Sequence, residues 1–186
     1  MTQLENEEVD GMDLDVPQPH SIWLVPKGAT FATLKKCIVD LADHTGNGPF
    51  DPHMTLLGDL QGSPTKTIQR CTDILSGSGA ISTRVTGLSR GDAFFKSLFL
   101  DLIVPEELLV ARTKLCAVLE VSGGGGFQPH ISLAYNETSD EYDPEILSVL
   151  GQNFADTTVI MTGVAVVSSA QNIPIARWRC LDHLSL

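Results

Sequence analysis

The sequence of 186 residues contains no apolar run long enough to cross a membrane. Its first residues also lack the basic start and hydrophobic core of a secretory signal. Together these absences predict an intracellular protein without membrane insertion, cytoplasmic by default, and leave association with an organelle such as the Golgi open. The four cysteines form no CxxC pair, so we expect buried, reduced thiols, with a regulatory pair of Cys71 and Cys180 as the alternative.

Positive charge is scarce, because 12 Lys and Arg face 23 Asp and Glu and give a net charge of −11. Six of the acids lie within the first sixteen residues, where no lysine or arginine and no apolar periodicity occur, so residues 1–18 are predicted to form a disordered acidic arm. The other 17 acids leave residues 19–186 at −5, and this part is expected to form a single domain of two packed lobes. Such a charge disfavours long nucleic acids but permits a small anionic substrate in a locally positive pocket.

Several types of site have no signature in the chain. Ser132 is not part of a G-x-S-x-G elbow, which disfavours a serine nucleophile. The ligand spacings of zinc sites are absent, so we expect neither a metal nor another cofactor. Glycines 123 to 126 precede an expected strand, whereas a phosphate-binding glycine loop leads into a helix, so a connecting loop is the better interpretation.

Apolar spacing predicts a mixed order of strands and helices. Helices are expected from an N-cap at Thr30, from Ser63-Pro64, after Pro105, and from Asp143-Pro144-Glu145. Strands are expected at 21–26, 82–88, 95–105, 157–167 and 173–181, together with two strands that carry the motifs described next.

Two stretches of the chain repeat one pattern, FDPHMTL at residues 50–56 and FQPHISL at 127–133. Each is preceded by a strand that ends in Val-Pro and by a helix, so the two halves of the chain look like copies of one unit. Side chains two apart in a strand share a face, which places His53 with Thr55 and His130 with Ser132. If the halves pack about a pseudo-two-fold axis, these four polar side chains meet in one cleft.

Two imidazoles and two hydroxyls suit the hydrolysis of a phosphodiester. In-line displacement needs a base on the attacking water and an acid on the departing oxygen, and histidine performs both roles near neutral pH. Hydroxyl groups can donate hydrogen bonds to the non-bridging oxygens as negative charge develops there. We expect His130 to be the base and His53 the acid.

The motifs PHMTL and PHISL resemble the paired H-x-T/S motifs of the 2H phosphoesterase superfamily, and SIWLVP and HISLAYN are most similar to its plant and fungal cyclic phosphodiesterases. This resemblance implies a bilobal α+β fold of two antiparallel sheets with outer helices. It also implies metal-independent hydrolysis of nucleoside 2',3'-cyclic phosphates to 2'-phosphates, and of ADP-ribose 1'',2''-cyclic phosphate, a by-product of tRNA splicing, to ADP-ribose 1''-phosphate. By the same resemblance His53 and His130 are catalytic, and Thr55 and Ser132 bind the phosphate.

Three further residues are candidates for contact with the substrate. The resemblance places Tyr135 near the phosphate, but its odd offset from His130 allows this only if the strand ends or bulges before it. Trp23 and either Phe94 or Phe95 are expected to stack on a base or to be core aromatics. His20, His44 and His183 lack the motif context and are expected to be structural or at the surface.

Two alternatives come from other functional classes. One is a related activity on RNA ends, such as 2'-5' ligation or removal of 3'-terminal nucleotides, which the acidic composition disfavours. The other is a nucleotide-binding module without activity, which both complete motifs disfavour. The expected partner is therefore a small cyclic phosphate bound by a monomer.

Overall fold

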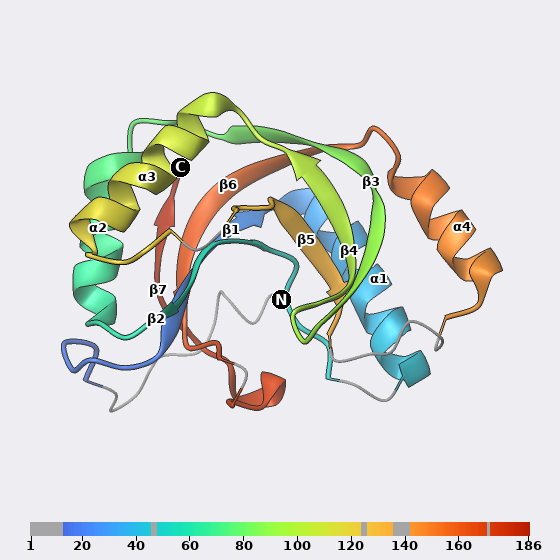
Figure 1. Ribbon diagram of the computed structural model, residues 1–186, viewed down its shortest axis with the longest axis horizontal. Helices are drawn as coiled ribbons and strands as arrows, with labels where there is room; N and C mark the ends of the chain where they lie inside the picture. The colour runs from blue at the N-terminus through green and yellow to red at the C-terminus, as the bar shows by residue number, and fades with distance from the viewer. Residues whose placement is uncertain (1–12, 46–47, 124–125, 136–141, 171) are drawn as a thin grey trace.

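The computed structural model describes residues 13–45, 48–123, 126–135, 142–170 and 172–186. Within them, seven antiparallel strands form one curved sheet (Figure 1). The strands are β1 (His20–Pro26), β2 (Met54–Leu60), β3 (Ile81–Ala93), β4 (Lys96–Ile103), β5 (His130–Ala134), β6 (Thr158–Val167) and β7 (Cys180–Ser185). The helices are α1 (Gly28–Thr45), α2 (Pro64–Leu75), α3 (Glu106–Val118) and α4 (Pro144–Phe154), with a short 3-10 helix at Ile175–Arg177. The expected α+β class is confirmed.

The sheet has the strand order β2-β1-β6-β3-β4-β5, with β7 on β6. Two separate sheets were expected. They are instead joined, because residues 158–161 of β6 pair with residues 81–84 of β3. The rest of β6 pairs with β7 along the same edge, so the two lobes separate beyond this short junction. The junction places both lobes in a fixed relation without a flexible linker.

Each lobe contains strands from both halves of the sequence. The first half supplies β1 and β2 to one lobe, and the third strand of that half, β3, pairs with β4 of the other lobe. In return β6, the third strand of the second half, pairs with β1. The pseudo-two-fold axis therefore passes between β3 and β6, and the lobes are not simply the two sequence halves.

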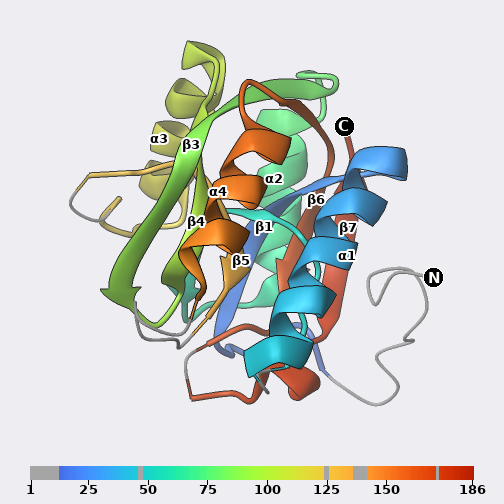
Figure 2. The same cartoon turned by 90° about the vertical axis from the view of Figure 1, so that its right-hand side faces the viewer.

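The helices lie on the outside of the sheet and are exchanged in the same way. Helices α2 and α3 pack together, and α2 covers β6 and β7. Helices α1 and α4 lie over the opposite lobe, against β5 and β3 respectively (Figures 1 and 2). Helix α1 follows β1 of one lobe and contacts β5 of the other, so it connects the two lobes. Helix α3, which follows β4, likewise packs against α2 on the other lobe.

The helix boundaries follow the expected chemistry with one exception. The Ser63 side chain caps α2 by accepting a hydrogen bond from the backbone N–H of Lys66 at 3.2 Å, and Asp143 caps α4 in the same manner. Helix α1, however, begins at Gly28 and not after Thr30. The backbone of Gly28 has a φ of 66°, which a glycine adopts without the steric cost that other residues meet, and this lets the chain enter the helix earlier.

The closing segment differs from its expected single strand at 173–181. It contains the 3-10 helix Ile175–Arg177, and only then does β7 begin, at Cys180. Pro174 cannot donate a hydrogen bond to a sheet, and it precedes the turn that places Trp178 under the sheet. The alternation of apolar residues that suggested a strand reflects the packing of this turn.

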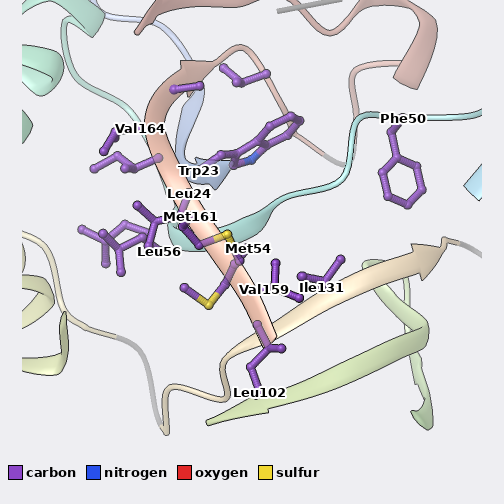
Figure 3. Close-up of a cluster of buried hydrophobic side chains, with 14 of the residues drawn as sticks. Trp23, Leu24, Phe50, Met54, Leu56, Leu102, Ile131, Val159, Met161 and Val164 are labelled. Atoms are coloured by element: carbon purple, nitrogen blue, oxygen red, sulfur yellow. The ribbon is translucent and has the colours of Figure 1, made fainter. Parts of the chain in front are cut away.

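A single apolar core fills the space behind both motifs (Figure 3). Met54 and Ile131, the residues that follow the two histidines, have no exposed surface, and Leu56 and Leu133 are as deeply buried. These four residues therefore pack on the side of the strands opposite the polar face. The burial of one face fixes the strand register, because a slip of one residue would turn the histidines into the core.

The predicted acidic arm ends earlier than residue 18. Leu14 packs against the core, and its carbonyl accepts hydrogen bonds from Ser63 Oγ and the backbone N–H of Thr65. The backbone N–H of Gln18 donates to the carbonyl of Gly62. Residues 14–18 are therefore held against the start of α2, and residues 1–12 of the arm lie outside the described residues.

All four cysteines have free thiols, with Cys71 and Cys116 buried and Cys37 and Cys180 half-buried. The alternative of a bonded pair between Cys71 and Cys180 is thus absent from the structure. Across the described parts of the chain, no helix combines the length and apolar character needed to span a membrane.

Candidate active site

His53 lies just before β2 and is held by three neighbours. Its Nδ1 is 2.6 Å from the carbonyl oxygen of Asp51, and because that oxygen can only accept, Nδ1 carries the proton. The indole of Trp23 stacks on the imidazole, with the ring centroids 3.4 Å apart and the planes at 6°. In the neutral ring Nε2 is then an acceptor, and it lies 3.3 Å from the hydroxyl of Tyr135.

His130, the first residue of β5, repeats this arrangement in the other lobe. Its Nδ1 is 2.8 Å from the carbonyl oxygen of Gln128, again two residues earlier. Phe99 contacts its ring edge-on, at 5.3 Å between centroids, where Trp23 stacks on His53. In both motifs a proline lies between the carbonyl and the histidine, and its fixed φ stiffens the turn that brings the two groups together.

The two motif strands carry matching β-bulges. On β2, Ile22 and Trp23 pair with Leu57 and Thr55, so Leu56 is an extra residue. On β5, Leu98 and Phe99 pair with Ala134 and Ser132, so Leu133 is an extra residue. A one-residue bulge reverses the alternation of side chains after it. Positions 58 and 135 therefore join the face that carries the histidines.

The bulge in β5 explains why Tyr135, at an odd number of residues after His130, lies on the same face as the histidine. The strand β5 also ends at Ala134, directly before the tyrosine, so both conditions that the sequence set for Tyr135 are met. The side chain is only 4% exposed, and it stacks on Phe50 with a centroid distance of 3.9 Å. Tyr135 thus crosses from the second motif to the histidine of the first.

Arg112 of α3 supports the bulge in β2. An extra residue in a strand leaves its backbone groups out of the ladder, and the Arg112 Nε donates to the carbonyl of Leu56 at 3.0 Å. A second nitrogen of the guanidinium donates to the carbonyl of Gly123, and the group lies 4.3 Å from the Phe127 ring centroid. A Cβ at residue 123 would lie 3.2 Å from the guanidinium, a tight contact that the glycine avoids.

The two predicted hydroxyls lie on the same face as the histidines but differ in their partners. Ser132 Oγ donates to the carbonyl of Phe95 at 2.8 Å. The half-buried Thr55 hydroxyl makes no hydrogen bond to any described residue. Thr55 is therefore ready to donate to an anion, whereas Ser132 must first exchange its partner.

The histidine and the hydroxyl residue of each motif line one cavity of about 170 Å³. The structure thus brings together every residue that the sequence selected for the site: His53, His130, Thr55, Ser132, Tyr135, Trp23 and Phe95. The remaining lining residues are Ser21, Gly58, Asp59, Lys96, Ser169 and Trp178. The polar faces of the two motifs meet, as their spacing predicted.

Burial sets the protonation of the site. Removal from water lowers the pKa of His53 to about 3, the hydrogen bond to the Asp51 carbonyl opposes this, and nearby His130 lowers it further. Burial also lowers the pKa of His130, with smaller contributions from the Gln128 carbonyl, which raises it, from Lys96, which lowers it, and from Asp101, which raises it. Burial raises the pKa of the Tyr135 hydroxyl. At neutral pH both imidazoles are therefore uncharged and Tyr135 keeps its proton.

The two candidates for base stacking differ in accessibility. Trp23 is 3% exposed and its ring face lies on His53, so it supports the imidazole and has no face for a base. Phe95 is half-buried at the cavity wall, with its edge toward Tyr135 at 5.3 Å between centroids. Phe94 contacts Phe95 and Tyr135 and is not among the lining residues.

The other histidines behave as expected. His20 has no exposed surface and contacts the Gln18 carbonyl and the Thr67 hydroxyl, each at 2.8 Å. His44 and His183 are exposed. None of the three lines the cavity.

Sequence reasoning missed two important members of the site. Lys96 is the single Lys or Arg among the described residues that line the cavity, and its Nζ is 3.2 Å from Gln128 Oε1. Gln128 in turn donates to Asp101, opposite His130, at 2.8 Å. Trp178 packs beside Trp23 and Tyr135. Lys96 was detectable as the basic residue at the start of the expected strand, but Trp178 lies 48 residues after His130 with no motif around it.

This geometry presents two neutral imidazoles, hydroxyl donors and one ammonium to a small ligand. The Nε2 atom of each neutral imidazole carries a lone pair that can accept a proton, and that of His53 faces the Tyr135 hydroxyl. The hydroxyls and Lys96 can donate hydrogen bonds to an anion. Within the described segments, no three His, Cys, Asp or Glu side chains gather as metal ligands would. The arrangement is that of an acid–base site for a small anionic ligand.

Solved structures with the same fold include E. coli LigT and TT0787 of Thermus thermophilus. A LigT structure in complex with 3'-AMP is 16% identical, with a TM-score of 0.55, and the match covers 91% of this chain and 98% of LigT. TT0787 is also 16% identical, with a TM-score of 0.58 and the same coverage. These identities establish a shared fold. A search of curated proteins gives no match.

A sequence model of the 2'-5' RNA ligase superfamily matches residues 51–172, which include both motifs and most of the chain. The chain belongs to the 2'-5' RNA ligase superfamily, the group of 2H phosphoesterases. The recognition of a 2H phosphoesterase is thereby confirmed, and phosphoesterase activity fits this superfamily.

The depressed pKa of His53 yields a direct test by NMR titration. In the free protein, the imidazole ¹⁵N signals of His53 should stay those of the neutral Nδ1–H form down to about pH 4, because burial penalises the charged ring. Inorganic phosphate should raise this pKa, because an anion stabilises the imidazolium. Titration of His53 in the free protein near the ordinary histidine pKa of about 6.5 would contradict the account.

Proposed function

We propose that the protein hydrolyses cyclic phosphodiesters without a metal ion. Its substrates would be nucleoside 2',3'-cyclic phosphates, opened to 2'-phosphates, and ADP-ribose 1'',2''-cyclic phosphate, opened to ADP-ribose 1''-phosphate as in the processing of tRNA-splicing by-products. The observation that carries the proposal is that His53 and His130, each with Nδ1 bound to a backbone carbonyl, line one small cavity together with Thr55 and Ser132.

The proposed reaction is an in-line displacement at phosphorus. One histidine takes a proton from water, which attacks phosphorus while the P–O bond to the leaving ribose oxygen breaks, and the other histidine gives its proton to that oxygen. Histidines from opposite lobes suit the two ends of such a displacement. We assign the base to His130 and the acid to His53.

The acid must carry a proton before the reaction, although the pKa of His53 is about 3 in the empty cavity. The bound phosphate anion supplies the charge that stabilises the protonated ring, so substrate and proton would bind together. The pKa of His130 is lowered mainly by burial, and the contribution of Lys96, which lowers it further, is opposed by the Gln128 carbonyl and the Asp101 carboxylate. This imidazole is therefore neutral, as a base requires.

The hydroxyl groups would bind the non-bridging oxygens. Thr55 has no partner among the described residues and can donate without losing a bond, whereas Ser132 must release the Phe95 carbonyl. Tyr135 keeps its proton and lies beside His53 Nε2, so it can orient that ring or donate to the phosphate. Phe95 forms part of the aromatic wall of the cavity beside Tyr135.

Two observations support a nucleotide as the substrate. The structurally similar LigT is seen with 3'-AMP, a nucleotide that bears its phosphate on a secondary ribose hydroxyl. The cavity of about 170 Å³ suits a phosphate with part of a ribose better than a polymer. The net charge of −11 also disfavours a long polyanion.

The second candidate function is an activity on RNA ends, either 2'-5' ligation or trimming of a 3' end. The name of the matching superfamily favours it. The scarcity of cationic side chains among the described lining residues speaks against it, because Lys96 is there balanced by Asp59.

The decisive assay measures hydrolysis of a nucleoside 2',3'-cyclic phosphate in the presence of EDTA. We expect release of the 2'-phosphate with a bell-shaped dependence of kcat/KM on pH, since one histidine must be neutral and the other protonated. Short oligonucleotides with 2',3'-cyclic or 2'-5' ends, tested alongside, distinguish the second candidate. No turnover of the cyclic nucleotide would refute the leading proposal.

Removal of either imidazole should greatly lower the rate of hydrolysis. We expect His53→Ala and His130→Ala each to lower kcat by about 10²- to 10⁴-fold, the usual contribution of a general acid or base. His183→Ala is the matched control, because this exposed histidine lies outside the cavity, and it should leave kcat unchanged. A near-normal rate in either motif variant would exclude the two-histidine mechanism.

The hydroxyls of Thr55 and Ser132 should contribute unequally to kcat/KM. Thr55→Val keeps the shape of the side chain but removes a ready donor, and we expect a loss of about 10²-fold in kcat/KM. Ser132→Ala should cost less, because the wild-type serine must first give up its bond to Phe95. Steady-state kinetics of both variants test this order, and a larger loss for Ser132→Ala would reverse it.

A further inference from the structure

Gly58 and Tyr135 occupy equivalent positions in the two motif strands. Each lies five residues after its motif histidine and two residues after a bulge, and both line the cavity. On β2 a second register shift follows between Leu57 and Leu60. Tyr135 fills its position and reaches across to within 3.3 Å of His53 Nε2. At the matching position on the other side of the pseudo-two-fold axis, Gly58 has no side chain, so the cavity is asymmetric at this point.

Neither the backbone nor the packing requires a glycine at residue 58. Its φ lies outside the left-handed region. Among the described glycines, Gly28, Gly79 and Gly126 have a left-handed φ. A Cβ placed there would meet only Thr55 Cγ2 at 3.6 Å and Ser21 Oγ at 3.8 Å, both ordinary contacts. The consequence of this glycine is therefore the open space in front of it.

The opposite end of the cavity is closed by aromatic rings. Tyr135 is stacked on Phe50, its centroid is 5.8 Å from that of Trp178, and both Tyr135 and Trp178 are buried. Gly58 and Asp59 are exposed. The hydroxyl of the buried Ser21 lies 3.8 Å from the position of a Cβ at residue 58 and donates to the Ser169 carbonyl at 3.4 Å. A ligand whose phosphate contacts both histidines can thus extend past Gly58 more readily than past Tyr135.

We propose that the notch formed by Gly58, Asp59 and Ser21 receives the organic group of the substrate, namely the ribose of a nucleotide with its base beyond. This inference rests on the proposed function and specifies the side from which the nucleotide enters. The Ser21 hydroxyl and the Asp59 carboxylate suit the hydroxyl and amino groups of a nucleoside. Gly58 then determines specificity, because a side chain there would exclude the nucleoside while leaving room for phosphate.

The test compares binding of adenosine 2'-phosphate and inorganic phosphate by calorimetry in wild-type protein and Gly58→Leu. We expect the Kd of adenosine 2'-phosphate to rise about 10-fold or more, and that of phosphate to change by less than about 3-fold. Gly87→Leu is the matched control, because Gly87 also lies in a strand with open space before it but outside the cavity. It should change neither constant.

The outcomes separate this inference from the proposed function. An unchanged ratio of the two constants in Gly58→Leu, or an equal loss for both ligands, would overturn the notch while leaving the hydrolytic proposal intact. Failure of the wild-type protein to turn over cyclic nucleotides would instead refute the proposed function. If Gly58→Leu does not fold, Gly58→Ala and Gly58→Val replace it, and a ratio that does not grow with side-chain size counts against the notch.

Discussion

The site depends on one hydrogen bond made twice, from the Nδ1 of each motif histidine to the carbonyl two residues before it. A carbonyl can only accept, so this bond fixes the tautomer and makes both Nε2 atoms acceptors. The Nε2 of His53 faces the Tyr135 hydroxyl at 3.3 Å, which a ligand would have to displace or share. The intervening Pro52 and Pro129 restrict the backbone so that the carbonyl stays in place. The repeated Pro-His pair is therefore a device for orienting an imidazole, and the hydroxyl two residues later shares its face because the strand begins there.

Two such units face each other because the third strand of each half is exchanged. β3 and β6 leave their own halves, pair with each other at residues 81–84 and 158–161, and so join the lobes through backbone hydrogen bonds. Helices α1 and α3 cross between lobes in the same sense, and Arg112 of α3 binds the bulged carbonyl of Leu56 in β2. Each half thus helps to shape the motif strand of the other, which keeps the two histidines in a fixed relation.

The sequence predicted the elements well, and also which side chains meet in the cavity, since both follow from local chemistry. The Ser63 cap, the buried Met54 and Ile131, and the four motif side chains come from patterns within a few residues. The strand exchange was not predictable, because no local pattern records which lobe β3 or β6 joins. The bulge at Leu56 escaped detection for the same reason, and with it the role of Gly58. Trp178 directly follows the 3-10 helix Ile175–Arg177, a segment whose alternating apolar residues had predicted a strand.

The most direct measurement is a crystal structure of the protein with inorganic phosphate or vanadate. The account predicts one anion in the cavity, with Nε2 of His53 and Nε2 of His130 both within hydrogen-bonding distance, about 2.6–3.2 Å, from opposite sides of phosphorus or vanadium. The Thr55 hydroxyl should donate to one of its equatorial oxygens. An anion that contacts one histidine alone, or that binds outside this cavity, would contradict the account.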